Sequence, residues 1–326
     1  MSAVPARRMI AVMVLVPVVV ALALWAFAWP AARTAPRDLP VGVAGPAAAV
    51  TQLERGFERR EGAFDVHRYD DEASARAAVE DRVVYGAVVA GPKGTSLLTA
   101  SGAGPVVAQL LEAVTAQAPA GTQVRVTDVA PLPSGDPRGT ALAASALPLA
   151  LAGVAAGALV TMSGLRGTRA AATLFGASAL VGLTATAISH SWLGVLQGDW
   201  WAEAAALSLT VAAPGATVAG FAALLGTPGI GLGALLMVLL GNPFSGAASA
   251  PELLPEPVGA IGQWLPPGAG ATLLRSVAYF DGRGAAAPLV TLSVWAALGL
   301  AAVFVGGRRR AAALAEAERP APVPVA

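Results

Sequence analysis

Residues Met9–Trp29 read MIAVMVLVPVVVALALWAFAW, and this stretch decides the fold class. It holds 21 uncharged residues, which at roughly 1.5 Å of rise per helical residue can cross a hydrocarbon core of roughly 30 Å. Arg7 and Arg8 precede the stretch, and Trp25 and Trp29 lie at its far end. This arrangement is typical of a membrane anchor whose N-terminus is cytoplasmic.

A cleaved secretory signal is the alternative for the same stretch, because Ala26-Phe27-Ala28 resembles a cleavage site. The apolar run is longer than the roughly 7–15 residues of a typical signal. We therefore expect residues 1–32 to form a short cytoplasmic stub and an uncleaved anchor helix.

The composition places the whole chain in the membrane class. Hydrophobic residues make up 56% of the sequence and charged residues 13%, whereas soluble domains carry roughly 25% charged residues. A net charge of +1 gives no basic excess that would indicate nucleic acid as a partner. The absence of cysteine excludes disulfides, thiolate metal sites and cysteine nucleophiles.

Residues 33–140 differ from the rest of the chain, because charges of both signs appear and short β-type runs alternate with helical ones. About 100 residues of this kind can bury one core, so we expect a small α/β domain. Pro92-Lys93-Gly94 supplies the turn of a strand pair. The expected strands are 39–45, 63–69, 83–91, 95–100 and 122–130, and the expected helices are 47–61, 71–82 and 106–117.

Five further hydrophobic segments follow, which gives an α-helical integral membrane protein with six transmembrane helices and the α/β domain between the first two. Residues 141–306 form the membrane domain. The segment 229–244 has 16 residues, about 24 Å as a helix, which is short for a complete crossing. The expected segments are 141–162, 172–190, 202–225, 229–244 and 286–306.

The connections between these segments set the expected orientation. Arg166 and Arg169 lie between the second and third segments, and Arg308–Arg310 follow the last, so both clusters should be cytoplasmic. The connection SWLGVLQGDWWAE, residues 191–203, carries three tryptophans and no lysine or arginine, as expected at the outer interface. We therefore expect a multi-pass protein of the cell membrane with an extracellular α/β domain, cytoplasmic termini and a disordered tail over 307–326.

The segment 242–285 is apolar but rich in proline and glycine. Its centre, PELLPEPVGAIGQWLPPGAGATLLRS from Pro251 to Ser276, contains five prolines, which forbid a straight spanning helix. Non-helical backbone at membrane depth is tolerated only where it is buried in protein or lines a wet cavity. We expect a re-entrant or interfacial segment packed on the outer ends of neighbouring helices.

The sequence offers no motif for catalysis or for nucleotide binding. GPKGTS at 91–96 lacks Walker spacing, and His67 and His190 fall in different compartments of the layout. No Ser/His/Asp set and no paired metal-ligand spacing occurs. We therefore expect no enzyme activity, no cofactor and no catalytic or metal-binding residue in this chain.

Ionisable residues are scarce in the six apolar segments, which argues against a self-powered proton antiporter. His190, Asp199 and Glu203 fall near the expected outer interface, where we expect water to reach them. Small-residue pairs such as Gly153 with Gly157, and GIGLG at 229–233, are best explained by close helix packing.

The layout of an anchor, an outer α/β domain and five more spans resembles ABC-2-type transporter permeases with a large first extracellular loop, including the YhgE/Pip-like branch. LPVGVAG resembles that family's first strand after the anchor, and DDEASARAAVEDRVVYGAVVAGPKG its acidic helix, strand and turn. The region 241–282 is similar to the ABC-2 C-terminal signature through Leu254-Pro255, the short helix 261–265, Pro266-Pro267 and Arg275.

The resemblance implies short helices at the extracellular mouth of a translocation path, a homodimer or permease heterodimer, and a separate ATP-binding subunit. Trp264 suits an interface, and Arg275 can snorkel outward or pair with Asp281. An interfacial cap without a gating role is the alternative for this segment. The expected outer gate comprises Asn242, Pro243, Leu254, Pro255, Trp264, Pro266, Pro267 and Arg275.

On the cytoplasmic side, Arg166 and Arg169 are the expected coupling residues, although SGLRGTRAA offers only a very short coupling element. The expected function is that of an exporter subunit. The competing hypothesis is an ATP-independent envelope protein whose extracellular domain binds a surface partner.

Overall fold

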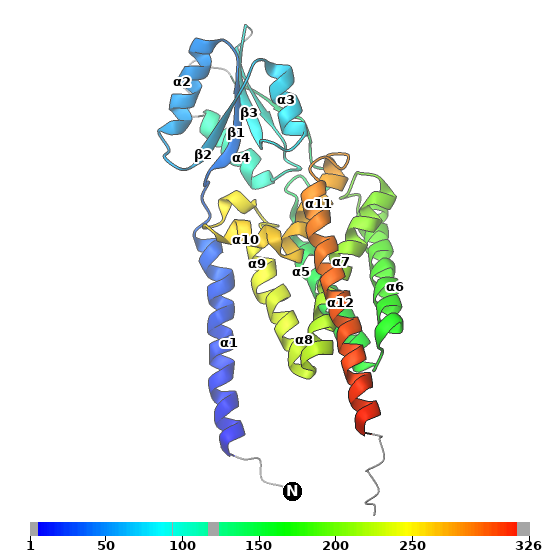
Figure 1. Ribbon diagram of the computed structural model, residues 1–326. Helices are drawn as coiled ribbons and strands as arrows, with labels where there is room; N and C mark the ends of the chain where they lie inside the picture. The colour runs from blue at the N-terminus through cyan, green and yellow to red at the C-terminus, as the bar shows by residue number, and fades with distance from the viewer. Residues whose placement is uncertain (1–5, 93, 117–123, 318–326) are drawn as a thin grey trace, which may run out of the picture.

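The protein consists of a small sheet domain placed on one end of a helical bundle, which we call the domain end (Figure 1). The computed structural model describes residues 6–92, 94–116 and 124–317. The chain is mostly helical, and six helices are long and apolar enough to cross a membrane, as the sequence predicted. These spans are Met9–Ala32, Thr140–Met162, Gly167–Trp192, Trp200–Leu225, Thr227–Phe244 and Ala286–Arg309.

The sheet has five strands in the order β2-β1-β3-β4-β5. Strand β1 pairs in parallel with β2 and β3, β3 and β4 form an antiparallel hairpin, and β4 pairs in parallel with β5. Four of the five strands fall within the predicted runs, and β4 begins one residue earlier, at Gly94, which was expected in the turn. Lys93, Thr122 and Gln123 lie outside the described residues. The strands are β1 (Leu39–Ala44), β2 (Phe64–Tyr69), β3 (Gly86–Gly91), β4 (Gly94–Thr99) and β5 (Val124–Asp128).

Three helices cover the two faces of this sheet. Helices α2 (Ala47–Glu58) and α4 (Pro105–Ala116) contribute to the core on one face, and α3 (Glu72–Glu80) contributes to the core on the other. Asp71 caps α3 by accepting a hydrogen bond from the Ser74 backbone N–H, which explains why the helix begins there. The predicted helices match these three, except that Gln117 lies outside the described residues.

Helix α7 (Trp200–Leu225) is the centre of the bundle, with 72% of its most apolar window buried. Helices α5 (Thr140–Met162) and α6 (Gly167–Thr186) and the last helix all pack on it. A Cβ atom on Gly157 of α5 would lie 2.3 Å from the carbonyl oxygen of Gly215 in α7. Only glycine permits so close an approach of two backbones, which confirms the packing predicted for this residue.

Helix α1 (Ala6–Ala32) stands apart from the bundle along most of its length (Figure 1). Only 6% of its most apolar window is buried. Its contact with the bundle is at the domain end, where Trp25 stacks on Trp29 with ring centroids 5.6 Å apart and lies edge-on to Phe244. The anchor is therefore attached to the other helices by one end.

Three elements differ from the sequence expectation. Helix α6 continues as a π-helix, η1 (Ala187–Trp192), and α8 (Thr227–Ala234) continues as a second π-helix, η2 (Leu235–Gly241). The last helix, α12, runs from Ala286 to Ala317, so the predicted disordered tail begins as helix. The alanine-rich sequence after Arg310 favours helix, and this explains why the predicted tail begins as a continuation of α12. Residues 318–326 lie outside the described part.

Candidate functional site

The proline-rich segment folds as a chain of short helices at the domain end. Proline occupies the first turn of three of them, where its missing N–H is not needed. Leu265, directly before Pro266, is extended, as the residue before a proline prefers to be, and this separates α10 from α11. The helices are α9 (Asn242–Phe244), the 3-10 helix η3 (Pro251–Leu253), α10 (Val258–Trp264) and α11 (Pro266–Tyr279).

Helix α11 enters the bundle and does not lie on its surface. Of its 14 residues, 11 are buried. A Cβ atom on Gly270 would lie 2.5 Å from Thr210 Cγ2 of α7, and Ala269 and Leu273 share an apolar cluster with Leu292 of α12. Small residues let α11 approach α7 closely, so a segment too broken to span the bundle still packs inside it.

The eight residues expected to form the gate lie in different environments. Trp264 is 75% exposed and its carbonyl oxygen accepts a hydrogen bond from Trp295 Nε1 at 2.7 Å. The outward position of Trp264 agrees with an interfacial role. Leu254, Pro255, Pro266, Pro267 and Arg275 are buried, and Asn242 and Pro243 are half-buried.

Arg275 corrects an expectation from the sequence. Its side chain neither snorkels to the surface nor pairs with Asp281, because it is only 5% exposed and its Nη2 donates a hydrogen bond to the Ala247 carbonyl oxygen at 2.7 Å. Gly246, with φ +66°, turns the chain so that this carbonyl points inward. Arg275 therefore holds the 246–250 turn against α11 from within.

Apolar side chains join this segment to both faces of the sheet. Ala250 and Leu253 belong to the same buried cluster as Val43 and Leu97, on the face covered by α2 and α4. Phe280, at the end of α11, belongs to the cluster on the opposite face. The sheet domain and the re-entrant segment therefore share two cores and form one packed unit.

Polar side chains reinforce this junction. Arg82 Nη1 donates hydrogen bonds to the Thr272 carbonyl oxygen at 3.0 Å and to the Ser276 hydroxyl oxygen. The Tyr85 hydroxyl donates to Glu252 Oε2 at 2.7 Å. Burial raises the pKa of the Tyr85 phenol and lowers the pKa of the Arg82 guanidinium to about 10, so Tyr85 is neutral and Arg82 is charged at neutral pH.

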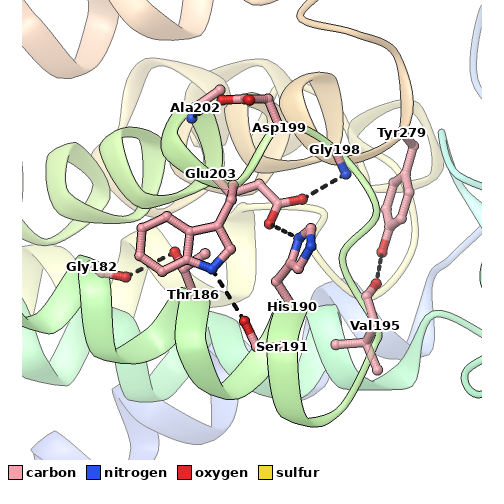
Figure 2. Close-up of polar contacts among 11 residues, drawn as sticks. Gly182, Thr186, His190, Ser191, Val195, Gly198, Asp199, Ala202, Glu203 and Tyr279 are labelled. Carbon is pink, nitrogen blue, oxygen red and sulfur yellow. Dashed lines mark hydrogen bonds and ion pairs between the residues drawn. The ribbon is translucent and has the colours of Figure 1, made fainter.

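A buried carboxylate lies beside α11, at the N-terminal end of α7. Glu203 has 0% exposure; one carboxylate oxygen lies 2.8 Å from His190 Nδ1, and the other accepts a hydrogen bond from the Gly198 backbone N–H at 2.8 Å. Figure 2 shows Glu203 held between these two groups. The expectation that water reaches Glu203 is therefore wrong, because the η1 turn and the 193–199 loop close over it.

This cluster is in direct contact with the end of α11. A Cβ atom on Gly198 would lie 1.9 Å from the carbonyl oxygen of Val277, so the loop backbone rests on α11. The Tyr279 hydroxyl donates to the Val195 carbonyl oxygen at 2.8 Å, as Figure 2 shows. A displacement of α11 would consequently disturb the hydrogen bonds of Glu203.

Arg166 and Arg169 lie at the start of α6, and the connection from α5 to α6 is at the end of the bundle away from the sheet domain (Figure 1). They are therefore not brought near the other predicted residues. Both are exposed, and Arg166 is the residue directly before α6. The connection between α5 and α6 consists of residues 163–166, with no helix of its own. Any coupling surface here would be made of helix ends and not of a separate element.

The residues that sequence reasoning missed are Arg82, Tyr85 and Glu252, and Glu203 was expected in contact with water and not in a buried site. Glu203 could have been found, because it lies inside the expected 202–225 span, where an acidic residue calls for a partner. Among the described residues, no group of three or more His, Asp or Glu could hold a metal ion. The arrangement offers polar contacts that fix the re-entrant segment to the sheet domain, and a separate buried carboxylate that fixes the 193–199 loop to α7.

Comparisons of the chain with protein-family models, with curated proteins and with solved structures find no match.

Proposed function

We propose that this chain is the membrane subunit of an ABC-2-like permease. In this proposal it acts as a dimer with a separate ATP-binding subunit and exports a hydrophobic or envelope-directed molecule. The observation that carries the proposal is the burial of α11 inside the bundle together with its shared cores with the sheet domain. Such a helix can close the outer end of a path and link it to an outer domain.

The charge distribution supports the orientation that this proposal needs. Arg166, Arg169 and Arg308–Arg310 lie toward the end away from the sheet domain, and Trp192, Trp200 and Trp201 lie toward the domain end. Positive residues favour the cytoplasmic side, and tryptophan favours the interfaces. The sheet domain is then extracellular.

The exposure of α1 supports a dimer or a lipid-facing anchor. With 6% of its most apolar window buried, this helix needs lipid or a second protein chain around it. Its single attachment at the domain end leaves the rest of its length available to a neighbouring subunit.

One observation favours the second candidate, an ATP-independent envelope protein whose outer domain binds a surface partner. The connections at the end away from the sheet domain are tight turns, residues 163–166 between α5 and α6 and Gly226 between α7 and α8. Within the described residues, neither turn provides a helix that an ATPase could grip.

Purification from native membranes in a mild detergent separates the two candidates. The permease proposal predicts an ATP-binding chain at a near-equal amount, which mass spectrometry would identify. The double variant Arg166→Glu/Arg169→Glu should lose this chain and keep its own oligomeric state. The matched variant Arg55→Glu, in the sheet domain, should retain it.

An intact, dimeric protein without any ATP-binding chain would contradict the permease proposal and favour the envelope protein. If the double variant retained the ATPase, Arg166 and Arg169 would have no role in coupling.

A further inference from the structure

The sheet domain contains an open groove of about 560 Å³ between α2 and α4. Its floor is formed by Val88 and Ala90 of β3 and Thr95 of β4, and its walls by Leu53 and Phe57 of α2 and Val114 of α4. This volume falls within the roughly 300–1,000 Å³ of small-molecule sites. The lining is mainly apolar, as in such sites.

The groove exists because two helices cover one face of a five-stranded sheet. Glu54 of α2 accepts two hydrogen bonds from the guanidinium of Arg68 in β2, which fixes α2 over the β2 side. Helix α4 packs over β4 and β5. The central strand β3 is consequently left at the bottom of the space between the helices.

The topology also favours a ligand at this place. After β1 the chain adds β2 on one side and β3 on the other, and α2 and α3 lie on opposite faces of the sheet. In open sheets of this kind, ligands bind near the carboxyl ends of the strands where the order reverses. The groove reaches this position at Ala49 in the first turn of α2 and at Ala90 near the end of β3.

Gly56 is a second, independent observation. It lies inside α2, where glycine is among the least favourable residues, and it lines the groove. Among the described residues, a Cβ atom there would have only the Arg59 guanidinium nearby, at 3.8 Å. Packing within the protein therefore does not require glycine at this position, whereas an occupant of the groove would gain the space.

Positive charge lies at one edge of this apolar groove. Arg59 and Arg60, at the end of α2, line it, and both are exposed. Among the described residues, the Arg59 guanidinium has no side-chain hydrogen bond or ion pair, so it can bind an anion. Within the part of the chain that the structure describes, no acidic side chain lines the groove.

We propose that this groove binds an amphiphilic anion, a molecule with an extended apolar body and a single carboxylate or phosphate end. The apolar body lies along Leu53, Gly56 and Phe57 over the floor of β3. The anionic end binds the arginines at the edge, with Arg59 as the specific partner. This site does not depend on transport or on an ATPase.

Fluorescence titration of the full chain in phosphatidylcholine nanodiscs tests the site. The probe is dansylaminoundecanoic acid, which brightens in an apolar site, and protein-free nanodiscs give the background. We expect saturable binding by the wild type and at least a tenfold loss of affinity in Gly56→Trp and Ala49→Phe, which fill the groove. Gly56→Ala should raise the thermal midpoint, because alanine favours helix, and should keep most of the binding.

The charge is tested separately. Arg59→Gln should weaken the carboxylate probe roughly fivefold and leave the corresponding neutral alcohol unchanged, while the matched variant Arg55→Gln, outside the groove, should bind as the wild type does. Competition by dodecanoate or by dodecyl phosphate then distinguishes a fatty acid from a phosphate-ended lipid.

Three results would overturn the proposal. They are wild-type fluorescence no greater than that of empty nanodiscs, equal binding by folded Gly56→Trp and Ala49→Phe, and equal loss of the acid and alcohol probes in Arg59→Gln. Circular dichroism confirms that each variant is folded, so that lost binding is not mistaken for lost structure.

Discussion

Helices α1 and α7 have nearly the same length, 27 and 26 residues, yet they occupy opposite environments. The most apolar window of α7 is 72% buried and that of α1 is 6% buried. The more hydrophobic helix, α1, is the exposed one. Hydropathy therefore shows that a helix can cross a membrane, and small residues show which helix lies at the centre of a bundle.

The difference lies in how closely other backbones approach. Helix α7 is rich in alanine, glycine and threonine, and three neighbours turn glycines toward it. A Cβ on Gly157, Gly182 or Gly299 would come within 2.3, 2.6 or 2.3 Å of an α7 backbone atom. Helix α1 also has eight alanines, but it has no glycine, and its six valines, three leucines and two methionines suit lipid and keep other backbones away.

The largest effect should come from filling one of these contacts. Gly157→Leu places a side chain against the α7 backbone, and we expect a loss of about 3 kcal/mol or more in stability. The protein should aggregate in size-exclusion chromatography after extraction. The matched change Ala21→Leu on the exposed surface of α1 should alter stability by less than about 0.5 kcal/mol. If the two variants lost equal amounts of stability, close packing would not distinguish α7 from α1.

The next effect concerns the buried carboxylate of α7. Glu203→Ala leaves His190 Nδ1 and the Gly198 N–H without their partner, and we expect a loss of about 2–4 kcal/mol, measured by unfolding titration in mixed micelles. Glu203→Gln retains one acceptor oxygen and should cost about half as much. Two wild-type-like variants would show that water replaces the carboxylate, and thus that the site is open.

A smaller effect should follow from loosening α1 at its one attachment. Trp29→Ala removes the stack with Trp25 and a contact with the Phe244, Leu254 and Val258 cluster. We expect a loss of about 1–2 kcal/mol in thermal unfolding. Trp192→Ala, at a residue that is 79% exposed, serves as the control and should be close to neutral.

The smallest effect should come from the middle of α1. Leu15→Ala, at a side chain that is 60% exposed, should change stability by less than about 0.5 kcal/mol in nanodiscs. The dimer fraction, measured in the same sample, distinguishes an α1 that faces lipid from an α1 that is covered by a second chain. A large loss of stability together with a lower dimer fraction would show that a second chain covers α1.

Much of this architecture could be predicted from local sequence. The strand runs and the six spans follow from periodicity and from lengths of apolar sequence, and each was found in place. Proline placed the breaks around α10 and α11, because the missing N–H acts on the residue itself and its immediate neighbours.

The environments of single polar residues could not be predicted in the same way. Arg275 and Glu203 both belong to segments that suggested contact with water, and both are buried. Their partners are backbone groups on the 246–250 turn and the 193–199 loop and, for Glu203, the His190 side chain as well. Such contacts depend on how a turn or loop folds back onto a helix, and the residue pattern of the helix does not record them.

The two π-helical stretches, Ala187–Trp192 and Leu235–Gly241, have a consequence for insertions and deletions. A π turn accommodates one residue more than an α turn of the same height. Deleting a single residue within 235–241 can thus be absorbed by a return to regular α geometry. A deletion in α8, outside the π turn, cannot be absorbed in this way and rotates everything that follows by about 100° around the helix axis. Residues 242–317 would then arrive at the sheet domain facing another direction.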